Sequence, residues 1–344
     1  MSVDEARLAA WLGASSVRVT PLGDGHSNLT YVVRVSDQAA SHEYVLRRPP
    51  EGPLLPTAHD VVREYRVLTL LNRDGRARVP RVVTACEDPE VIGAPFYLME
   101  RISGEVVRET LPGWLDAEAD RRALGLDLAD ALAEIHTVDW RLFVAEGLGP
   151  ESGYLERQLR RWVGQREGIQ EAMAAAGGEA RELPDYEVVR DWLQVNVPTE
   201  VAPSVVHGDF KLDNVVVSGG YGSPPRVASV LDWEMATVGD PRADLGYLLS
   251  FWPEPGESVP LVTLPSVEPG FPTRSEMVEQ WERGTGREAG DTGWFMALAV
   301  WKLAILLEAS YHRWLAGMAH DPFFERLDKG VPALLARARE LSGA

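Results

Sequence analysis

His207-Gly208-Asp209-Phe210-Lys211-Leu212-Asp213-Asn214 is the most informative segment of this 344-residue chain, and a second acidic cluster, Leu231-Asp232-Trp233-Glu234, follows it. Phosphoryl transfer needs one carboxylate that orients an acceptor hydroxyl and accepts its proton, and Asp209 is the candidate for that role. It also needs oxygen ligands that hold Mg²⁺ against nucleotide phosphates. The Asn214 amide and the Asp232 carboxylate are the candidates for these ligands.

Short β-branched runs surround this segment and predict a hairpin. Two such strands around a Gly-rich turn would carry Asn214 and Asp232 at the same end, within reach of one cation. Simpler interpretations exist, because Lys211 and Asp213 suit a turn and Asp232 alone suits a loop cap. The joint spacing favours the catalytic interpretation. The runs are residues 203–206, 215–217 and 226–231, with Ser218-Gly219-Gly220 between the last two.

The pattern His-Gly-Asp-x-x-x-x-Asn followed by Asp-Trp-Glu resembles the aminoglycoside phosphotransferase/choline kinase family. The resemblance extends over roughly residues 20–250 and is greatest to the branch fused to, or encoded beside, acyl-CoA dehydrogenases. In that family the segment after the metal aspartate implies a structural role for the Asp244 carboxylate, which would accept backbone N–H bonds. The similar segments are Tyr44-Val45-Leu46-Arg47-Arg48-Pro49-Pro50, Ala58-His59-Asp60, Phe96-Tyr97-Leu98-Met99-Glu100, Leu132-Ala133-Glu134-Ile135-His136 and Gly239-Asp240-Pro241-Arg242-Ala243-Asp244-Leu245-Gly246.

This resemblance implies an α+β, bilobal protein-kinase-like fold. Residues 1–103 would form a small nucleotide-binding lobe around an antiparallel sheet. Residues 104–344 would form a larger, mainly helical lobe that carries catalysis and substrate binding. The implied cofactors are ATP and Mg²⁺.

A glycine-containing turn between two predicted strands, residues 17–19 and 29–35, is the candidate phosphate loop. Glycines let backbone N–H groups approach phosphate oxygens closely. The turn lacks the third glycine of protein kinases, so alone it is also consistent with an ordinary hairpin. Its candidate nucleotide-binding residues are Gly23, Gly25, Ser27 and Asn28.

The next predicted strand, residues 43–48, has no lysine where protein kinases place one, but it contains Arg47 and Arg48. Arginine can fork onto phosphate oxygens. Strand alternation puts the two on opposite faces, and we favour Arg47 as the phosphate contact, with a solvated edge arginine as the alternative. Glu64 shares the apolar face of a predicted helix over residues 60–71 and needs a partner. That partner is the strand arginine or, alternatively, a surface neighbour such as Arg63 or Arg66.

Family resemblance alone places adenine beside the backbone of Glu100 to Ile102, at a hinge after the strand of residues 96–100. The remainder is expected to be helical, with leucines of residues 123–136 on one core stripe and His136 structural. Five tryptophans in the second half suit either an acceptor pocket or, more simply, the core. They are Trp252, Trp281, Trp294, Trp301 and Trp314.

Bulk properties exclude several classes of protein. A net charge of −18 argues against nucleic-acid binding, which needs clustered Lys and Arg. A single cysteine, Cys86, excludes a disulfide framework and is expected to be an inert thiol. The N-terminus has no signal-peptide pattern, and the most apolar run, residues 295–307, is shorter than a membrane span and contains Lys302. We therefore expect a cytoplasmic protein that binds no membrane; the sequence does not indicate its oligomeric state.

The leading hypothesis is a small-molecule kinase that transfers the γ-phosphate of ATP to a hydroxyl, with a hydroxyacyl-CoA as one acceptor implied by the nearest branch. An aminoglycoside kinase and a non-catalytic nucleotide-binding regulator are the alternatives. His207 is expected to order the loop. Glu234 would reach a second metal through water or face solvent.

Overall fold

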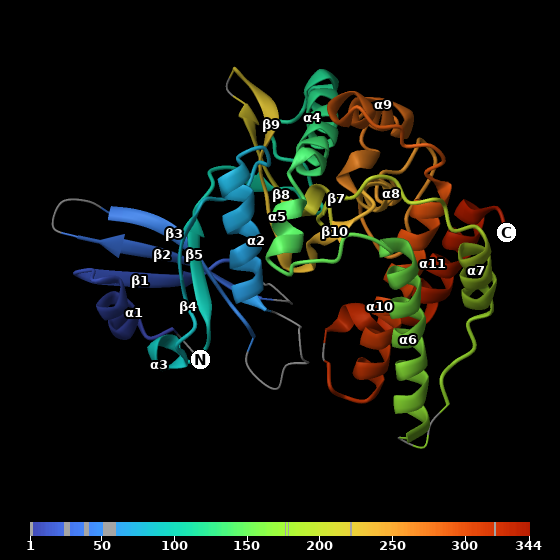
Figure 1. Ribbon diagram of the computed structural model, residues 1–344, viewed down its shortest axis with the longest axis horizontal. Coiled ribbons are helices and arrows are strands. Elements are labelled where there is room, and N and C mark those ends of the chain that lie inside the picture. The colour runs from blue at the N-terminus through green and yellow to red at the C-terminus, as the bar shows by residue number, and fades with distance from the viewer. Residues whose placement is uncertain are drawn as a thin grey trace.

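The computed structural model describes residues 3–23, 28–37, 41–50, 60–175, 177, 179–220, 222–319 and 321–344. It confirms the predicted α+β, bilobal kinase-like architecture. A five-stranded sheet lies on one side of the molecule, and a larger assembly of helices lies on the other (Figure 1).

The smaller lobe is an antiparallel sheet whose strands run in the order β1-β2-β3-β5-β4. Phe96, Tyr97, Leu98 and Met99 are consecutive and all buried, as expected of a strand whose two faces are both covered. One face packs on helix α1 (Glu5–Leu12) and the short helix α3 (Pro89–Ile92). Cys86 is buried on this side. The strands are β1 (Ser16–Pro21), β2 (Leu29–Ser36), β3 (Ser41–Arg48), β4 (Val82–Cys86) and β5 (Phe96–Glu100).

Helix α2 (Val61–Asp74) covers the opposite face of the sheet, between it and the larger lobe (Figure 1). Asp60 caps its first turn by accepting the Arg63 N–H at 2.9 Å, and Gly75 ends it in the left-handed conformation at φ 78°. The helix predicted over residues 60–71 is therefore confirmed, three residues longer at its C-terminal end.

The larger lobe combines helices with two small sheets, β6-β8-β9 and β10-β7. The predicted leucine stripe of helix α4 is fully buried and forms the centre of this lobe. The short strands are β6 (Glu105–Val106), β7 (Ser204–Val206), β8 (Val215–Gly220), β9 (Ser223–Val230) and β10 (Thr237–Gly239). The helices are α4 (Glu118–Thr137), α5 (Arg141–Ala145), α6 (Tyr154–Ala175), α7 (Pro184–Val195), α8 (Arg242–Ser250), α9 (Arg274–Thr285), α10 (Gly293–Leu315) and α11 (Leu327–Ser342).

Helix α10 is longer than the apolar run that suggested it. With 23 residues it is long and apolar enough, by length and composition alone, to cross a membrane. The prediction that this segment is shorter than a membrane span was therefore wrong. Of its most apolar window, 61% is buried inside the protein, where α10 packs against α8 and α11. This burial agrees with the expectation of a core helix.

The five tryptophans follow the simpler expectation and belong to the core. Trp252, Trp281, Trp294 and Trp301 are each at most 4% exposed, and Trp314 packs against the cluster formed by α6, α7, α10 and α11. They are core aromatics, and none of them lines the cavity described below.

Candidate active site

The predicted hairpin is present and brings the two candidate metal ligands together. Strands β8 and β9 pair with Val215 opposite Val230, and the Leu231 N–H donates to the Asn214 carbonyl at 2.8 Å. Paired strands lie about 4.8 Å apart. Asn214 and Asp232 therefore sit at the same end of neighbouring strands.

Asp209 lies on the loop between β7 and β8 and is held by Asn214. The Asn214 Nδ2 donates to the Asp209 Oδ2 at 2.7 Å and to the Asp209 carbonyl at 2.8 Å. These bonds leave the Asn214 amide oxygen as the atom that a cation can use. The Lys211 ammonium lies 3.8 Å from the Asp209 Oδ1 and 3.2 Å from the Asp213 carboxylate, so the candidate turn residues also face the site.

Asp244, on α8, fixes the start of this loop. Its carboxylate accepts the His207 N–H at 2.6 Å and the Gly208 N–H at 2.8 Å, which confirms the implied backbone contacts. His136 lies 3.4 Å from the same carboxylate, in the structural position expected of it. Burial by itself would raise the pKa of Asp244, but its contacts with His136 and Gly208 outweigh burial and lower that pKa.

His207 orders the loop from inside, as expected. Its Nδ1 accepts the Asp209 N–H at 3.2 Å, so its Nε2 donates to the Leu231 carbonyl at 2.8 Å. This tautomer follows from the partners. Gly208 has φ 88°, and an added Cβ would lie 2.9 Å from the Met235 Cβ, so only glycine fits here.

Arg47 connects the two lobes through a chain of charges. Its guanidinium donates to the Glu64 carboxylate at 2.9 Å and to the Asp232 Oδ1 at 3.0 Å. Glu64 is 1% exposed and also accepts the Trp233 N–H at 3.1 Å. Burial raises the pKa of Glu64 to about 7, against the opposing effect of Arg47. The prediction that Glu64 pairs with the strand arginine is confirmed.

Arg48 does not reach this site. It lies on the other face of β3, is 5% exposed and donates to the Ile92 carbonyl at 3.1 Å. Its inclusion among the phosphate-contact candidates was therefore wrong. The cause is the strand period of two, which turns adjacent side chains to opposite faces.

Asp232 has a left-handed backbone conformation, with φ 64° and ψ 66°. A non-glycine residue in this region carries roughly 1–2 kcal/mol of strain. Such strain persists where surrounding contacts over-determine a functional geometry. Here the contacts are the Arg47 bond on the side chain and the Glu64 bond to the next N–H.

Arg63 is a structural residue whose role the sequence did not reveal. Its guanidinium donates to the carbonyls of Glu234 at 3.1 Å, Leu148 at 3.3 Å and Ala236. It thereby ties α2 to the loop after Asp232. Any residue can offer a carbonyl, so the sequence does not mark such partners. The alternative prediction that Arg63 pairs with Glu64 was wrong, because Glu64 pairs with Arg47.

Asn28 joins the candidate phosphate loop to the same region. It is 3% exposed, and its Nδ2 donates to the Glu234 Oε2 at 3.2 Å. Gly23 has φ 76°, whereas Gly25 and Ser27 lie outside the described residues. Glu234 therefore contacts the phosphate-loop side of the site and is partly buried.

The hinge candidates follow β5, the strand between β3 and β4 in the sheet of the smaller lobe. β5 ends at Glu100, whose N–H is already bonded to the Arg81 carbonyl at 2.8 Å. Ile102 lies in the irregular segment between β5 and β6. A base at this hinge would therefore use the Glu100 carbonyl and later backbone groups.

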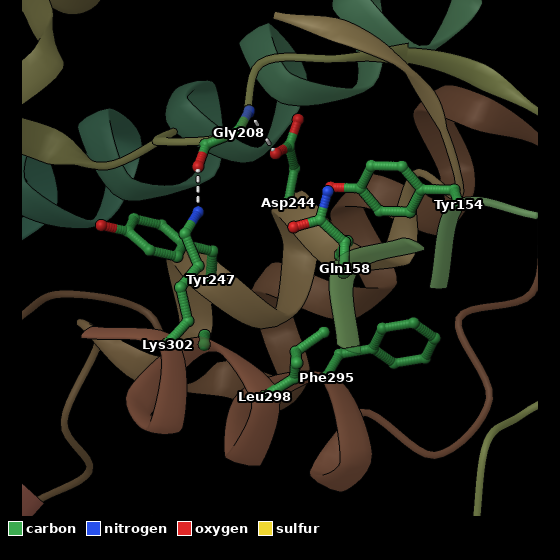
Figure 2. A pocket seen from close by; sticks show the side chains of 10 residues that line it. Tyr154, Gln158, Gly208, Asp244, Tyr247, Phe295, Leu298 and Lys302 are labelled. Atoms are coloured by element: carbon green, nitrogen blue, oxygen red, sulfur yellow. Dashed lines mark hydrogen bonds between the residues drawn. The ribbon is translucent and has the colours of Figure 1, made fainter. Parts of the chain in front are cut away.

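A small cavity of about 20 Å³ adjoins the Asp209 loop, between α6, α8 and α10 (Figure 2). Lys302 of α10 reaches across it and donates to the Gly208 carbonyl at 3.0 Å. In the sequence, Lys302 is marked only as a single charge within an apolar run. The cavity is lined by Tyr154, Gln158, Gly208, Ala243, Asp244, Tyr247, Phe295, Leu298, Ala299 and Lys302.

The donor set suits a magnesium–nucleotide complex. One amide oxygen and one carboxylate are hard ligands, and the Asp232 Oδ2 is not used by Arg47. Over the described ranges, no cluster of three His, Cys, Asp or Glu side chains forms a self-sufficient metal site. Phosphate oxygens and water would therefore complete the coordination, as is usual for Mg²⁺.

Comparison with known proteins agrees with this geometry. Residues 18–271 match the model of the Phosphotransferase enzyme family. Acyl-CoA dehydrogenase family member 11 of Homo sapiens is 34% identical over 301 residues, which are 85% of this chain and 36% of that protein. The chain thus spans about a third of the length of this relative.

Solved structures show the same fold. A Ralstonia eutropha protein named as a candidate aminoglycoside phosphotransferase is 29% identical, with a TM-score of 0.79 and 99% of each chain covered. Choline kinase of Cryptosporidium parvum is 12% identical, with a TM-score of 0.61, 94% of this chain and 90% of that chain covered. The chain belongs to the phosphotransferase enzyme family and has its kinase-like fold.

Proposed function

We propose that this protein is an ATP- and Mg²⁺-dependent kinase that phosphorylates a hydroxyl of a small molecule. The observation that carries the proposal is the position of Asn214, which bonds Asp209 through its amide nitrogen and lies beside Asp232 at the hairpin end. A candidate base and two candidate metal ligands thus form one connected unit. A module that only bound nucleotide would have no use for the base.

The residues divide the chemistry among them. Asn214 and Asp232 would hold the metal ion, which when bound neutralises charge on the phosphates. Arg47, already directed at Asp232, would contact the phosphates from the smaller lobe. Asp209 would orient the acceptor hydroxyl. As the hydroxyl oxygen bonds to the γ-phosphorus and the bond to the leaving ADP oxygen breaks, the hydroxyl proton passes to Asp209.

For the acceptor we propose a hydroxyacyl-CoA or a related metabolite. The support is the likeness to relatives named as acyl-CoA dehydrogenases, in which this chain corresponds to one part of a longer protein. An aminoglycoside is the second candidate, because the Ralstonia eutropha structure carries that name.

The test is ADP release with Mg²⁺–ATP across hydroxyacyl-CoAs, aminoglycosides, choline-like amines and sugars. We expect acceptor-dependent ADP release that Asp209→Asn lowers at least 1,000-fold, within the range of general-base catalysis and positioning combined. Asp191→Asn, which changes an exposed carboxylate of α7, is the matched control and should retain full turnover. ATP binding without acceptor-stimulated turnover by any compound would favour a nucleotide-binding regulator.

A further inference from the structure

We propose that Lys302 is a positioning residue for Asp209, and that its ammonium fixes the orientation of the Gly208–Asp209 peptide from helix α10. The proposal rests on the proposed function of Asp209. Lys302 is distant in sequence from the loop, and its bond to the Gly208 carbonyl is 3.0 Å long (Figure 2).

Side chains bond the peptide groups at the start of this loop, residues 207–209. Asp244 accepts the N–H groups of His207 and Gly208, and His207 accepts the N–H of Asp209. The Gly208 carbonyl is bonded by Lys302. Lys302 therefore supplies the bond on the carbonyl side of the peptide that leads into Asp209.

This peptide needs external fixation because of Gly208. With φ 88° and no side chain, Gly208 has access to backbone conformations that other residues avoid. Rotation of the following peptide would move the Asp209 carboxylate away from the acceptor hydroxyl. Misplacement of a catalytic group by about 1 Å can cost on the order of 100-fold in rate.

The surroundings of Lys302 direct its charge to the loop. Its ammonium lies 5.4 Å from the centre of the Trp162 ring and 5.2 Å from that of Tyr247. Among the described residues no carboxylate forms an ion pair with it, and its hydrogen bond is to Gly208. The adjoining cavity of about 20 Å³ holds roughly one water molecule and is too small for an acceptor. Lys302 is therefore placed to hold the backbone.

Burial lowers the pKa of Lys302 to about 8, although Asp209 on the loop and Asp244 on α8 oppose the shift. The positive charges of Arg161 on α6 and Lys211 on the loop lower the pKa of Lys302 further. Tyr154 and Tyr247 also line the cavity beside Lys302. Below pH 8 the ammonium is intact and its bond to Gly208 is charge-assisted. As pH rises through 8 that charge is lost, and the bond weakens.

Steady-state kinetics of three proteins test the proposal. We expect Lys302→Met to lower kcat about 10- to 100-fold while KM for ATP and for the acceptor changes less than about 3-fold. Wild-type kcat should fall above pH 8. Lys302→Arg keeps a permanent charge and should retain most of the turnover without that fall. A raised acceptor KM with kcat intact would show that Lys302 binds substrate, and a change in thermal stability alone would show a purely structural role; either result overturns the proposal.

Hydrogen–deuterium exchange of the loop amides separates this proposal from the proposed function. In Lys302→Met the amides of residues 207–210 should exchange at least 10-fold faster than in wild type, whereas Lys302→Arg should match wild type. This result stands even if no acceptor supports turnover. Unchanged exchange in Lys302→Met, with the variant folded by circular dichroism, would contradict the positioning role.

Discussion

Two groups of buried charges meet at the candidate active site, and they are built differently. In the first, the Arg47 guanidinium binds both the Glu64 and the Asp232 carboxylates, so charged side chains mainly satisfy charged side chains. In the second, Asp244 and Lys302 bind the backbone around Gly208. The first group positions side chains across the two lobes. The second fixes the backbone path of the loop. Because its partners are backbone groups, a second substitution cannot supply a new partner if Asp244 or Lys302 is replaced.

The largest expected effect is in the second group. Asp244→Asn replaces one of two acceptor oxygens by a donor, so at least one buried N–H of the loop loses its partner. Hydrogen bonds to charged groups contribute about 1.5–3 kcal/mol, and an unpaired buried donor adds to the loss. We expect the free energy of unfolding to fall by about 3 kcal/mol and kcat to fall about 100-fold. Urea denaturation and turnover measure the two effects. A fall in the free energy of unfolding below about 1 kcal/mol would contradict the role given to Asp244 in the second group.

The next effect sharpens the role of the first group. Arg47→Met should raise KM for ATP about 10-fold or more, because it removes the one strand guanidinium directed at Asp232. Arg48→Met is the matched control on the same strand. It removes only the bond to the Ile92 carbonyl, so we expect a stability cost of about 1 kcal/mol and an unchanged KM. Equal KM values in the two variants would contradict the assignment of faces.

The smallest effect concerns how α2 is fixed. Arg63→Met removes donors to three carbonyls and should lower the free energy of unfolding by about 2 kcal/mol. Arg66 lies three residues further along the helix, and its side chain is 46% exposed. At the surface it binds the carbonyl and the carboxylate of Glu146. Arg66→Met should cost about 0.5 kcal/mol or less. Thermal denaturation of both variants tests the difference. Equal losses of stability would show that the carbonyl contacts of Arg63 contribute no more than the surface contacts of Arg66.

The two groups also differ in how far sequence could predict them. The Arg47–Glu64 pair was predictable because a carboxylate on an apolar helix face needs a charged partner. The hairpin with Asn214 and Asp232 was predictable because strand and turn residues have a strong local signal. The family resemblance supplied the fold and the role of Asp244.

Contacts to backbone carbonyls were the part that sequence could not supply. Arg63 and Lys302 bind carbonyl groups, which every residue possesses, so no residue type marks the partner. The bond of Lys302 to the loop also depends on how α10 packs against α8, where Gly246 lets Phe295 approach closely. Such a long-range packing arrangement is set by the whole fold.

Binding of Mg²⁺–ATP to Asp232→Asn and to Asp209→Asn, measured by calorimetry with and without Mg²⁺, tests the division of roles at the site most directly. We expect Asp209→Asn to bind Mg²⁺–ATP within about 3-fold of wild type, because the base does not hold the metal. Asp232→Asn should lose the Mg²⁺-dependent part of the affinity. Retained Mg²⁺ dependence in Asp232→Asn, or its loss in Asp209→Asn, would contradict the account.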